Sequence, residues 1–333
     1  MVKIIGRLKS IGFGLEESTA RGTAVAAQTF YPVLDHSFNP RTNKAVNTSS
    51  RGRIEDADSA AVAEIFSEGS IEAKVLIDSF GFLLKSLMGT LVSTASTGAT
   101  GNVFGHTFTV LQTSSHPSIT VSVDDPNGDT LFANSMIDNM DISVEQGDYV
   151  KFAMNMIGKQ GATGTVTPAF SDEVEFVPKD VTLKMAATST GLGSATGIPV
   201  QSMSVAINAN VEREQVIGDT SPSDVLNKQF SVEMEFEKIK VNDTFRDLVE
   251  AATNRAFQFQ LEDSTTELST SSTGFYPTYR ITLYKAQVIE HDTSNPNDDF
   301  VTETVKVKAF FSSSDSKMID MFLQNGSTGY NPA

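Results

Sequence analysis

The chain has 333 residues, of which 39% are apolar and 20% charged, so it can form one large domain or two ordinary ones with a buried core. Its formal net charge of −16 argues against tight binding of nucleic acid through a basic surface. The absence of cysteine excludes disulfides, thiolate metal sites and cysteine nucleophiles. The first residues, MVKIIGRLKS, lack the apolar run of a signal peptide, and no segment is apolar for long enough to span a bilayer. We therefore expect a soluble protein of the cytoplasm that does not enter a membrane.

Short alternating runs separated by Gly, Asn, Asp and Pro predict a mainly β fold with few helices. A polar stretch over residues 39–68 has weak periodicity and is expected to be a loop, either functional or simply solvated. Its first part is basic and its second part acidic, which would suit contact between neighbouring copies of the chain. The charged residues are Arg41, Lys44, Arg51, Arg53, Glu55, Asp56 and Asp58.

The stretch GSIEAKVLIDSFGFLLKSLMG (residues 69–89) changes its period from two to about 3.6. Ile71, Ala73, Val75 and Ile77 alternate with more polar residues, as in a half-buried strand. An apolar stripe at i, i+3, i+4, i+7 and i+8 then predicts a helix that begins at Phe80. Further along, residues 141–159 read as a hairpin that turns at Gln146-Gly147.

The second half repeats this order of strand, helix and hairpin. Residues 230–237 alternate like a strand, a helical stripe begins at Phe245, and residues 285–311 read as a hairpin with a longer loop. Four short matches occur in the same order at offsets of 167, 161, 165 and 155 residues, namely Pro32-Val33 with Pro199-Val200, Ser70-Ile71-Glu72 with Ser231-Val232-Glu233, Phe80 with Phe245, and Val150-Lys151 with Val305-Lys306. We therefore predict a duplication with a boundary near residues 167–180, giving domains 1–170 and 171–333.

No catalytic or metal-binding motif is convincing. The four histidines have no partners at metal-ligand spacing, and GLGSATG (residues 191–197) misses the dinucleotide-binding fingerprint by one residue. Asp124, Asp125 and Asp129 could cup a calcium ion, but they lack the EF-hand order and Asp-Pro-Asn-Gly is a turn sequence in its own right. We expect no enzyme activity, no cofactor and no metal.

An acidic ladder is the feature that stands out. Glu233, Glu235 and Glu237 share one face of a strand whose other face is apolar. Stacked carboxylates repel one another unless they are solvated or paired. This face is either the wet side of an antiparallel sheet or a surface that must not hold a polyanion.

The N-terminal segment GFGLEESTARGTAVAAQTFYPV (residues 12–33), followed by the polar stretch and by EGSIEAKVLIDSFGFLLKSLMGTLV, resembles the major tail tube proteins of long-tailed bacteriophages. The resemblance lies in Gly14-Leu15-Glu16, in Arg21-Gly22-Thr23, in Glu68-Gly69-Ser70 and in the helix that follows. In the second half only the order of elements is similar.

The resemblance implies two tandem tail-tube β-sandwich or barrel domains, each with one flanking helix. It further implies rings that stack around a tape-measure protein, contacts with tail terminator and distal tail proteins, a loop that bridges to the next ring, and an acidic lumen through which double-stranded DNA passes without specific binding. Such a protein is assembled in the host cytoplasm and belongs to the virion tail. Members with one tube domain form hexamers, so two domains imply a homotrimer that makes a pseudo-hexameric ring. Three copies with about 24 strands would enclose a bore wide enough for a duplex. We expect the lumen-facing residues to be Glu72, Glu233, Glu235 and Glu237, and the inter-ring contacts to come from the charged residues of 41–58.

Two alternatives stay open. The chain could carry one tube domain and a β-sandwich decoration, and then form a hexameric ring. It could also be a β-sandwich adhesin or binding module that forms no tubes.

Overall fold

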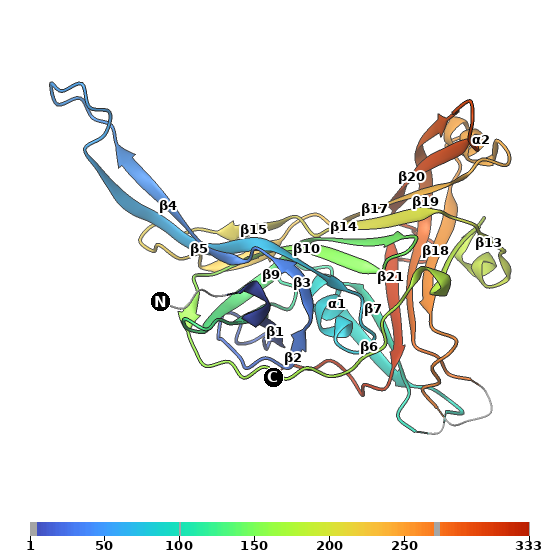
Figure 1. The fold of residues 1–333 in the computed structure, drawn as a ribbon, viewed down its shortest axis with the longest axis horizontal. Coiled ribbons are helices and arrows are strands. Elements are labelled where there is room, and N and C mark those ends of the chain that lie inside the picture. Colours follow the sequence, from blue (N-terminus) through green and yellow to red (C-terminus); the bar gives the residue numbers. More distant parts are fainter. Residues whose placement is uncertain (1–4, 100, 270–273, 333) are drawn as a thin grey trace.

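Antiparallel strands dominate the computed structural model, which describes residues 5–99, 101–269 and 274–332 (Figure 1). The prediction of a mainly β fold with few helices is confirmed. Within these ranges there are two α-helices, α1 (Phe80–Met88) and α2 (Thr244–Glu250), and neither is long and apolar enough to cross a membrane. Three short 3-10 helices cover Gly6–Leu8, Pro178–Asp180 and Ser189–Ser194.

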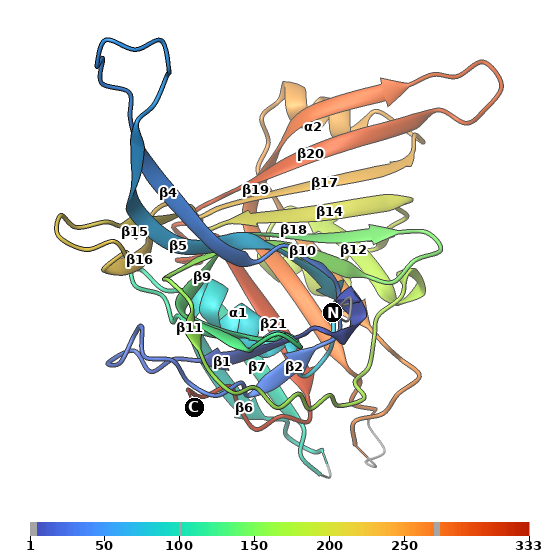
Figure 2. The same cartoon turned by 60° about the vertical axis from the view of Figure 1, so that its left-hand side comes forward.

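Eight strands form one curved antiparallel sheet, which we call the main sheet (Figure 2). At its centre β14 pairs with β9 along its whole length, so both halves of the chain share the sheet without a break. In spatial order its strands are β3 (Val33–His36), β5 (Ser59–Lys74), β10 (Lys151–Gly158), β9 (Thr130–Glu145), β14 (Ser202–Asn208), β17 (Ser231–Ile239), β20 (Thr302–Phe310) and β19 (Thr278–Ser294).

Outside the main sheet, a second layer is formed by two separate groups of strands, one associated with each half of the chain. The long strands β9 and β19 belong to both layers, because each pairs with the second layer through its first part and with the main sheet through its last part. In the first half this layer contains β2 (Thr29–Tyr31), β1 (Ser10–Leu15), β8 (Ile119–Asp124) and β11 (Ala162–Thr163). In the second half it contains β13 (Gly197–Ile198), β12 (Val181–Ala186), β18 (Arg255–Glu262) and β21 (Ile319–Asn325), and the hairpin β6 (Gly89–Ala95) and β7 (Phe104–Val110) adds to it through β7–β21 pairing.

Each half contributes four strands to the main sheet with the same connections. The order β3-β5-β10-β9 of the first half is repeated as β14-β17-β20-β19 in the second. The β-bulges also match: β9 carries an extra residue, Asp138, opposite β10, and β19 carries Ile289 opposite β20. When the two halves are aligned at these bulges, Asn139 of the first half corresponds to Glu290 of the second, and Lys151 corresponds to Thr302.

Two of the four sequence matches agree with this correspondence and two are wrong by four residues. Phe80 with Phe245 and Pro32 with Pro199 agree. In contrast, Glu72 pairs with Ala153, and the counterpart of Ala153 is Thr304, which pairs with Glu237. Glu72 therefore corresponds to Glu237 and not to Glu233. The matches of Ser70 and of Val150 fail in the same way. The physical reason is that an alternating strand looks the same after any even shift, so sequence alone does not fix its register.

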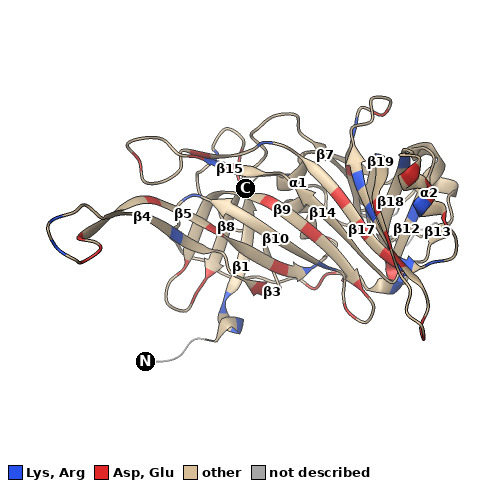
Figure 3. Ribbon diagram, turned by 90° about the horizontal axis from the view of Figure 1, so that it is seen from above, with Lys and Arg blue, Asp and Glu red and all other residues tan. Residues whose placement is uncertain are grey.

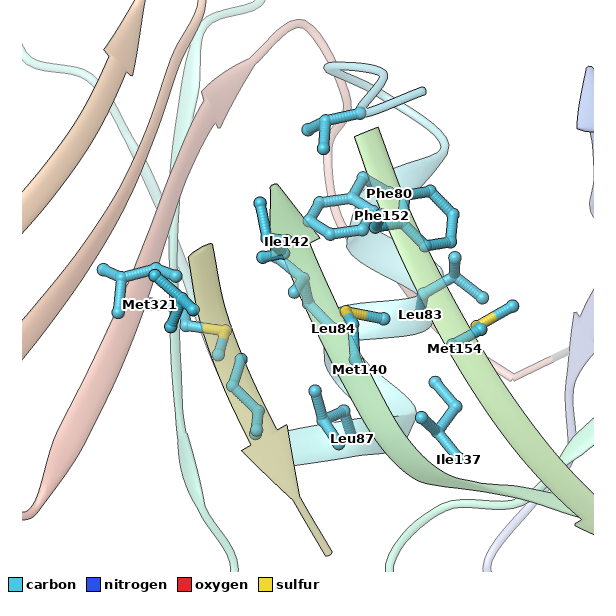
Figure 4. Close-up of a cluster of buried hydrophobic side chains, with 14 of the residues drawn as sticks. Phe80, Leu83, Leu84, Leu87, Ile137, Met140, Ile142, Phe152, Met154 and Met321 are labelled. Carbon is cyan, nitrogen blue, oxygen red and sulfur yellow. The ribbon is translucent and has the colours of Figure 1, made fainter. Parts of the chain in front are cut away.

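Helix α1 fills the space between the two layers of the first half. Its predicted stripe of Phe80, Leu83, Leu84 and Leu87 faces apolar side chains of β9 and β10 (Figure 4). The Phe80 ring lies 5.1 Å from that of Phe152 and 5.3 Å from that of Tyr279, so the helix also contacts the second half. Each such buried side chain contributes about 1.5–3 kcal/mol.

The start of α1 is held by residues far away in the chain. The Glu173 carboxylate accepts hydrogen bonds from the backbone N–H groups of Asp78 and Ser79 at 2.8 and 2.7 Å, and so caps the helix from outside. The Tyr330 hydroxyl donates to the Asp78 carbonyl at 2.8 Å, and the Asn325 side chain donates to the Ile77 carbonyl at 2.7 Å. The segment between the halves and the C-terminal segment therefore both fix α1.

Replacing Asp78 with Asn is expected to stabilise the protein at pH 8 by about 1 kcal/mol and to leave it nearly unchanged at pH 4. Burial and the nearby Glu173 carboxylate raise the pKa of Asp78 to about 6, and its Oδ1 atom is buried without a partner. The folded state therefore holds a proton that the unfolded state releases between about pH 4 and 6, and the wild type loses stability over that range. Urea unfolding of both proteins at the two pH values measures the difference, and an equal difference at both would contradict this role of Asp78.

Candidate functional site

The main sheet has one packed face and one polar face. Toward the second layer it presents buried residues such as Ile71, Phe152, Ile142, Val205 and Phe236. The opposite side, which we call the polar face, is seen in Figure 3 with acidic positions spread over it and fewer basic ones. Its charged residues in the described part of the chain are Asp35, Glu68, Glu72, Lys74, Lys151, Asp141, Glu145, Glu233, Glu235, Glu237, Lys285, Lys306, Lys308, Glu290 and Asp292.

The structure places all four glutamates of the lumen prediction on this face, but it pairs two of them with lysine. Lys308 Nζ lies 2.7 Å from Glu233 Oε1, and Lys306 Nζ lies 3.8 Å from Glu235 Oε2. Lys306 also binds Glu290 at 2.8 Å, and this contact lowers the pKa of Glu290. Because these groups are nearly half exposed, solvent screens each pair and its contribution to stability is small.

The rest of the polar face stays acidic. In the described part of the chain, Glu72, Glu237, Asp141 and Glu145 take part in no ion pair. Asp141 and Glu145 are not among the predicted lumen residues, although they alternate with Ile142 and Val144. Lys306 and Lys308 were not predicted for this face either, although they alternate with valine in VKVK at the same period as the glutamate ladder.

The polar stretch over residues 39–68 is not the loop that the sequence predicts. Strand β4 (Asn39–Asn47) pairs with the first part of β5 from Asn39↔Glu68 to Asn47↔Ser59, and the two form a ribbon that projects from the body (Figure 1). Most residues of the ribbon are exposed on both faces, so no side needs apolar residues and the alternation of a half-buried strand is missing. We call residues 39–68 the arm.

The charged residues of the arm lie along its length and are not gathered into one patch. Arg41 lies at its base, opposite Phe66, and Lys44 lies further out, opposite Val62. Arg51, Arg53, Glu55, Asp56 and Asp58 belong to the tip, where Arg51 Nη1 binds Asp58 Oδ2 at 2.6 Å. The tip also exposes Ile54 fully.

A second hairpin braces the base of the arm. It consists of β15 (Val211–Glu214) and β16 (Asp224–Asn227) and connects β14 to β17, just as the arm connects β3 to β5. The Arg213 guanidinium lies over the Phe66 ring, 3.4 Å from its centroid, and its Nε atom lies 3.6 Å from Glu64 Oε1. These contacts fix the direction in which the arm leaves the body.

The aspartates proposed for calcium instead stabilise a turn. Asp125 accepts the Asn127 N–H at 2.9 Å and binds Lys9 at 2.6 Å, and Asp129 accepts the Val166 N–H at 2.7 Å. Among the described residues no group of three or more His, Asp or Glu side chains is arranged to hold a metal ion. Two of the histidines are buried and bonded within the fold, His106 to Ser93 and Asn325 and His116 to two backbone carbonyls.

Comparison with known proteins gives a family. No curated protein matches the chain. Among solved structures, the tail tube of SPP1, determined by solid-state NMR and cryo-electron microscopy, is 12% identical, with 46% of this chain and 81% of that chain covered and a TM-score of 0.29, a likeness too weak to establish a shared fold. The family model described as "Phage tail tube protein" matches residues 6–309, which is most of the chain, and the protein therefore belongs to the phage tail tube protein family.

Proposed function

We propose that the chain is the building block of a phage tail tube, in which rings of copies stack and the polar face lines the bore. The observation that supports this best is the unbroken eight-stranded main sheet, with one face packed and the other polar along every strand. Curved sheets of this kind close into barrels when their edges meet. In the finished tail the bore holds first a tape-measure protein and later double-stranded DNA during ejection.

The two halves are copies of one tube domain, residues 1–170 and 171–333. The identical strand order supports this, and so do the matching bulges in two separate strand pairs. The pairing of β8 with β9 shifts between Ile119 and Val121, and that of β18 with β19 shifts between Arg255 and Phe257. A β-bulge is a specific local irregularity, and its repetition at corresponding places is poorly explained by chance.

Three copies make one ring. They supply 24 strands, whose spacing of ~4.8 Å gives a backbone diameter of about 37 Å before the strands are tilted. When paired residues are followed from strand to strand across the first half, Asp35 on the first strand leads to Ala206 on the first strand of the second half. The counterpart of Asp35 on that strand is Ser202, and Ala206 lies four residues beyond it. A stagger of four residues over four strands tilts the strands by about 35°, as closed barrels require, and widens the backbone diameter to about 45 Å. Such a bore accommodates a duplex about 20 Å wide with room for side chains.

The acidic bore lets DNA slide. Carboxylates on the wall, among them Glu72, Glu233, Glu235 and Glu237, release no counterions to a passing polyanion and so create no sites at which it would be held. Lys306 and Lys308 do not change this, because each is already paired with a glutamate.

The arm joins one ring to the next. It extends beyond the body, has exposed backbone edges and carries both charges, with Lys44, Arg51 and Arg53 basic and Glu55, Asp56 and Asp58 acidic. Tail terminator and distal tail proteins close the two ends of the tube, which is assembled in the host cytoplasm and becomes part of the virion.

Shortening the arm is expected to abolish tubes and leave single rings or protomers. In the test variant, residues 44–63 are replaced by Asn-Gly, which closes a hairpin after the Asn43↔Glu64 pair. The control replaces residues 215–223, the tip of the second hairpin, by the same dipeptide. It keeps Arg213 against Phe66, loses the hydrogen bond from the Ile65 N–H to the Thr220 carbonyl, and should still form tubes. Electron microscopy of both proteins gives the result, and tubes of normal length from the armless protein would refute the bridging role.

Negative-stain microscopy of the purified protein tests the function itself. We expect hollow rods whose end-on views show three protomers around a central hole. Uniform globules would contradict a tube protein, and six protomers per ring would instead support one tube domain with a decoration.

A further inference from the structure

Both borders of the main sheet carry a strand edge that has no partner within the described protomer. At one border, residues 287–294 of β19 pair only with β20. At the other border, residues 33–41 pair only with β5. They form one continuous edge, because β3 and the start of β4 pair with β5 in the same register, from His36↔Ile71 to Asn39↔Glu68. Unpaired N–H and C=O groups at such edges are templates for another strand.

The centre of the same sheet shows how these edges fit together. There β9 of the first half pairs with β14 of the second, in the register Ser143↔Ser204 and Asp141↔Ala206. The bulges make β19 the counterpart of β9. The match of Pro32 with Pro199 makes residues 35–41 the counterpart of residues 202–208. The strand pairing gives the same alignment, because Glu72 pairs with Asp35, and Glu237, the counterpart of Glu72, pairs with Ser202.

The geometry points to a seam between copies, in which residues 290–294 of β19 pair antiparallel with residues 37–41 of the next copy in the ring. The register transfers from the centre of the sheet and sets Ser294 opposite Ser37, Asp292 opposite Asn39, and Glu290 opposite Arg41. This inference rests on the proposed tube function, since it names the surface through which the ring closes.

The chemistry of the two edges fits this register. Glu290 and Arg41 carry opposite charges, and Ser294 with Ser37 repeats the serine pair Ser143–Ser204 of the central join. The faces also agree, because Phe38 is buried against Phe132, with ring centroids 5.1 Å apart, just as its counterpart Val205 is buried. Pro40 lacks an N–H group and lies opposite His291 in this register, so the seam has one hydrogen bond fewer than the central join. The missing donor and the charges of both edges limit pairing of the free protomer with other strands.

A cysteine pair tests the register directly, because the chain has no cysteine of its own. In Ser37→Cys/Ser294→Cys, oxidation of assembled tubes should link neighbouring copies and give a ladder in non-reducing gels that ends at three chains. The in-chain control Ser143→Cys/Ser204→Cys should form its disulfide within one protomer. In the off-register control Ser37→Cys/Glu290→Cys, the cysteines are about 13 Å apart along the strand and should not link.

The outcomes separate the seam from the function. Tubes that form without linked chains in the test variant, while the in-chain control oxidises, overturn the seam and leave the tube function intact. Absence of tubes from the wild type overturns both. If the cysteine variants do not assemble, hydrogen exchange of wild-type protein decides: the amides of residues 290–294 should exchange at least about tenfold more slowly in tubes than in protomers, and unchanged exchange refutes the seam.

Discussion

Replacing Glu303 with Gln should lower the free energy of unfolding by about 3–5 kcal/mol. Glu303 is fully buried on the packed face of the main sheet. Its carboxylate binds Lys238 Nζ at 2.7 Å and His291 Nε2 at 2.8 Å, and all three side chains are less than one-tenth exposed. A neutral amide leaves the Lys238 ammonium buried without its counter-charge, which costs far more than the loss of a surface pair. Urea unfolding at pH 7 measures the loss.

The first half provides a matched control for this prediction. The counterparts of Lys238, Glu303 and His291 are Ala73, Phe152 and Met140, which are all buried and apolar. Exchanging the complete charged cluster for these residues removes every buried charge at once, and such exchanges are commonly neutral or stabilising. The triple variant Lys238→Ala/Glu303→Phe/His291→Met should therefore be at least as stable as the wild type. A loss below about 1 kcal/mol in Glu303→Gln would show that the cluster is not a desolvated charge pair.

Neutralising the glutamate ladder should make assembled tubes bind DNA. In Glu233→Gln/Glu235→Gln/Glu237→Gln, Lys308 loses its partner and Lys306 keeps only Glu290. Free lysines on the wall release counterions from DNA, so we expect the affinity for a short duplex to rise by at least about tenfold at low salt and to fall again as salt is added. Fluorescence anisotropy with sheared tubes over a series of salt concentrations gives both quantities.

A variant with the same change in net charge serves as the control. Glu17, Asp172 and Glu267 are exposed, lie outside the main sheet and take part in no ion pair among the described residues, so their replacement frees no basic side chain. Converting these three to their amides should leave DNA binding unchanged, because they do not face the bore. Equal binding by the two variants would mean that only net charge matters and that the ladder does not line the bore.

The elements that could be predicted from the sequence are those whose burial is one-sided. The apolar stripe of α1 and the alternation in β5, β9 and β17 each reflect one packed face, so the period reveals the element. The arm could not be recognised as strands, because its residues are mostly exposed on both faces and no alternation is needed. Likewise the lengths of β9 and β19 follow from their membership in two layers, which no local pattern records.

In the repeated order of elements and in the candidate site, too, some features could be predicted from the sequence and others could not. The repeated order of strand, helix and hairpin could be predicted from the sequence, but the alignment of Glu72 with Glu233 was wrong by four residues because strand patterns repeat every two. The bulges at Asp138 and Ile289 fix the register, and nothing in the local sequence marks them. The glutamate ladder could be found, whereas its pairing with Lys306 and Lys308 depends on the register between β17 and β20.

A helical reconstruction of the assembled tube by cryo-electron microscopy tests the central claim most directly. We expect a closed barrel of 24 strands per ring, three protomers around it, and the carboxylates of Glu72 and Glu237 pointing into the bore. A map in which the polar face lies outside, or in which the main sheets of neighbouring copies do not join into one barrel, would contradict the account.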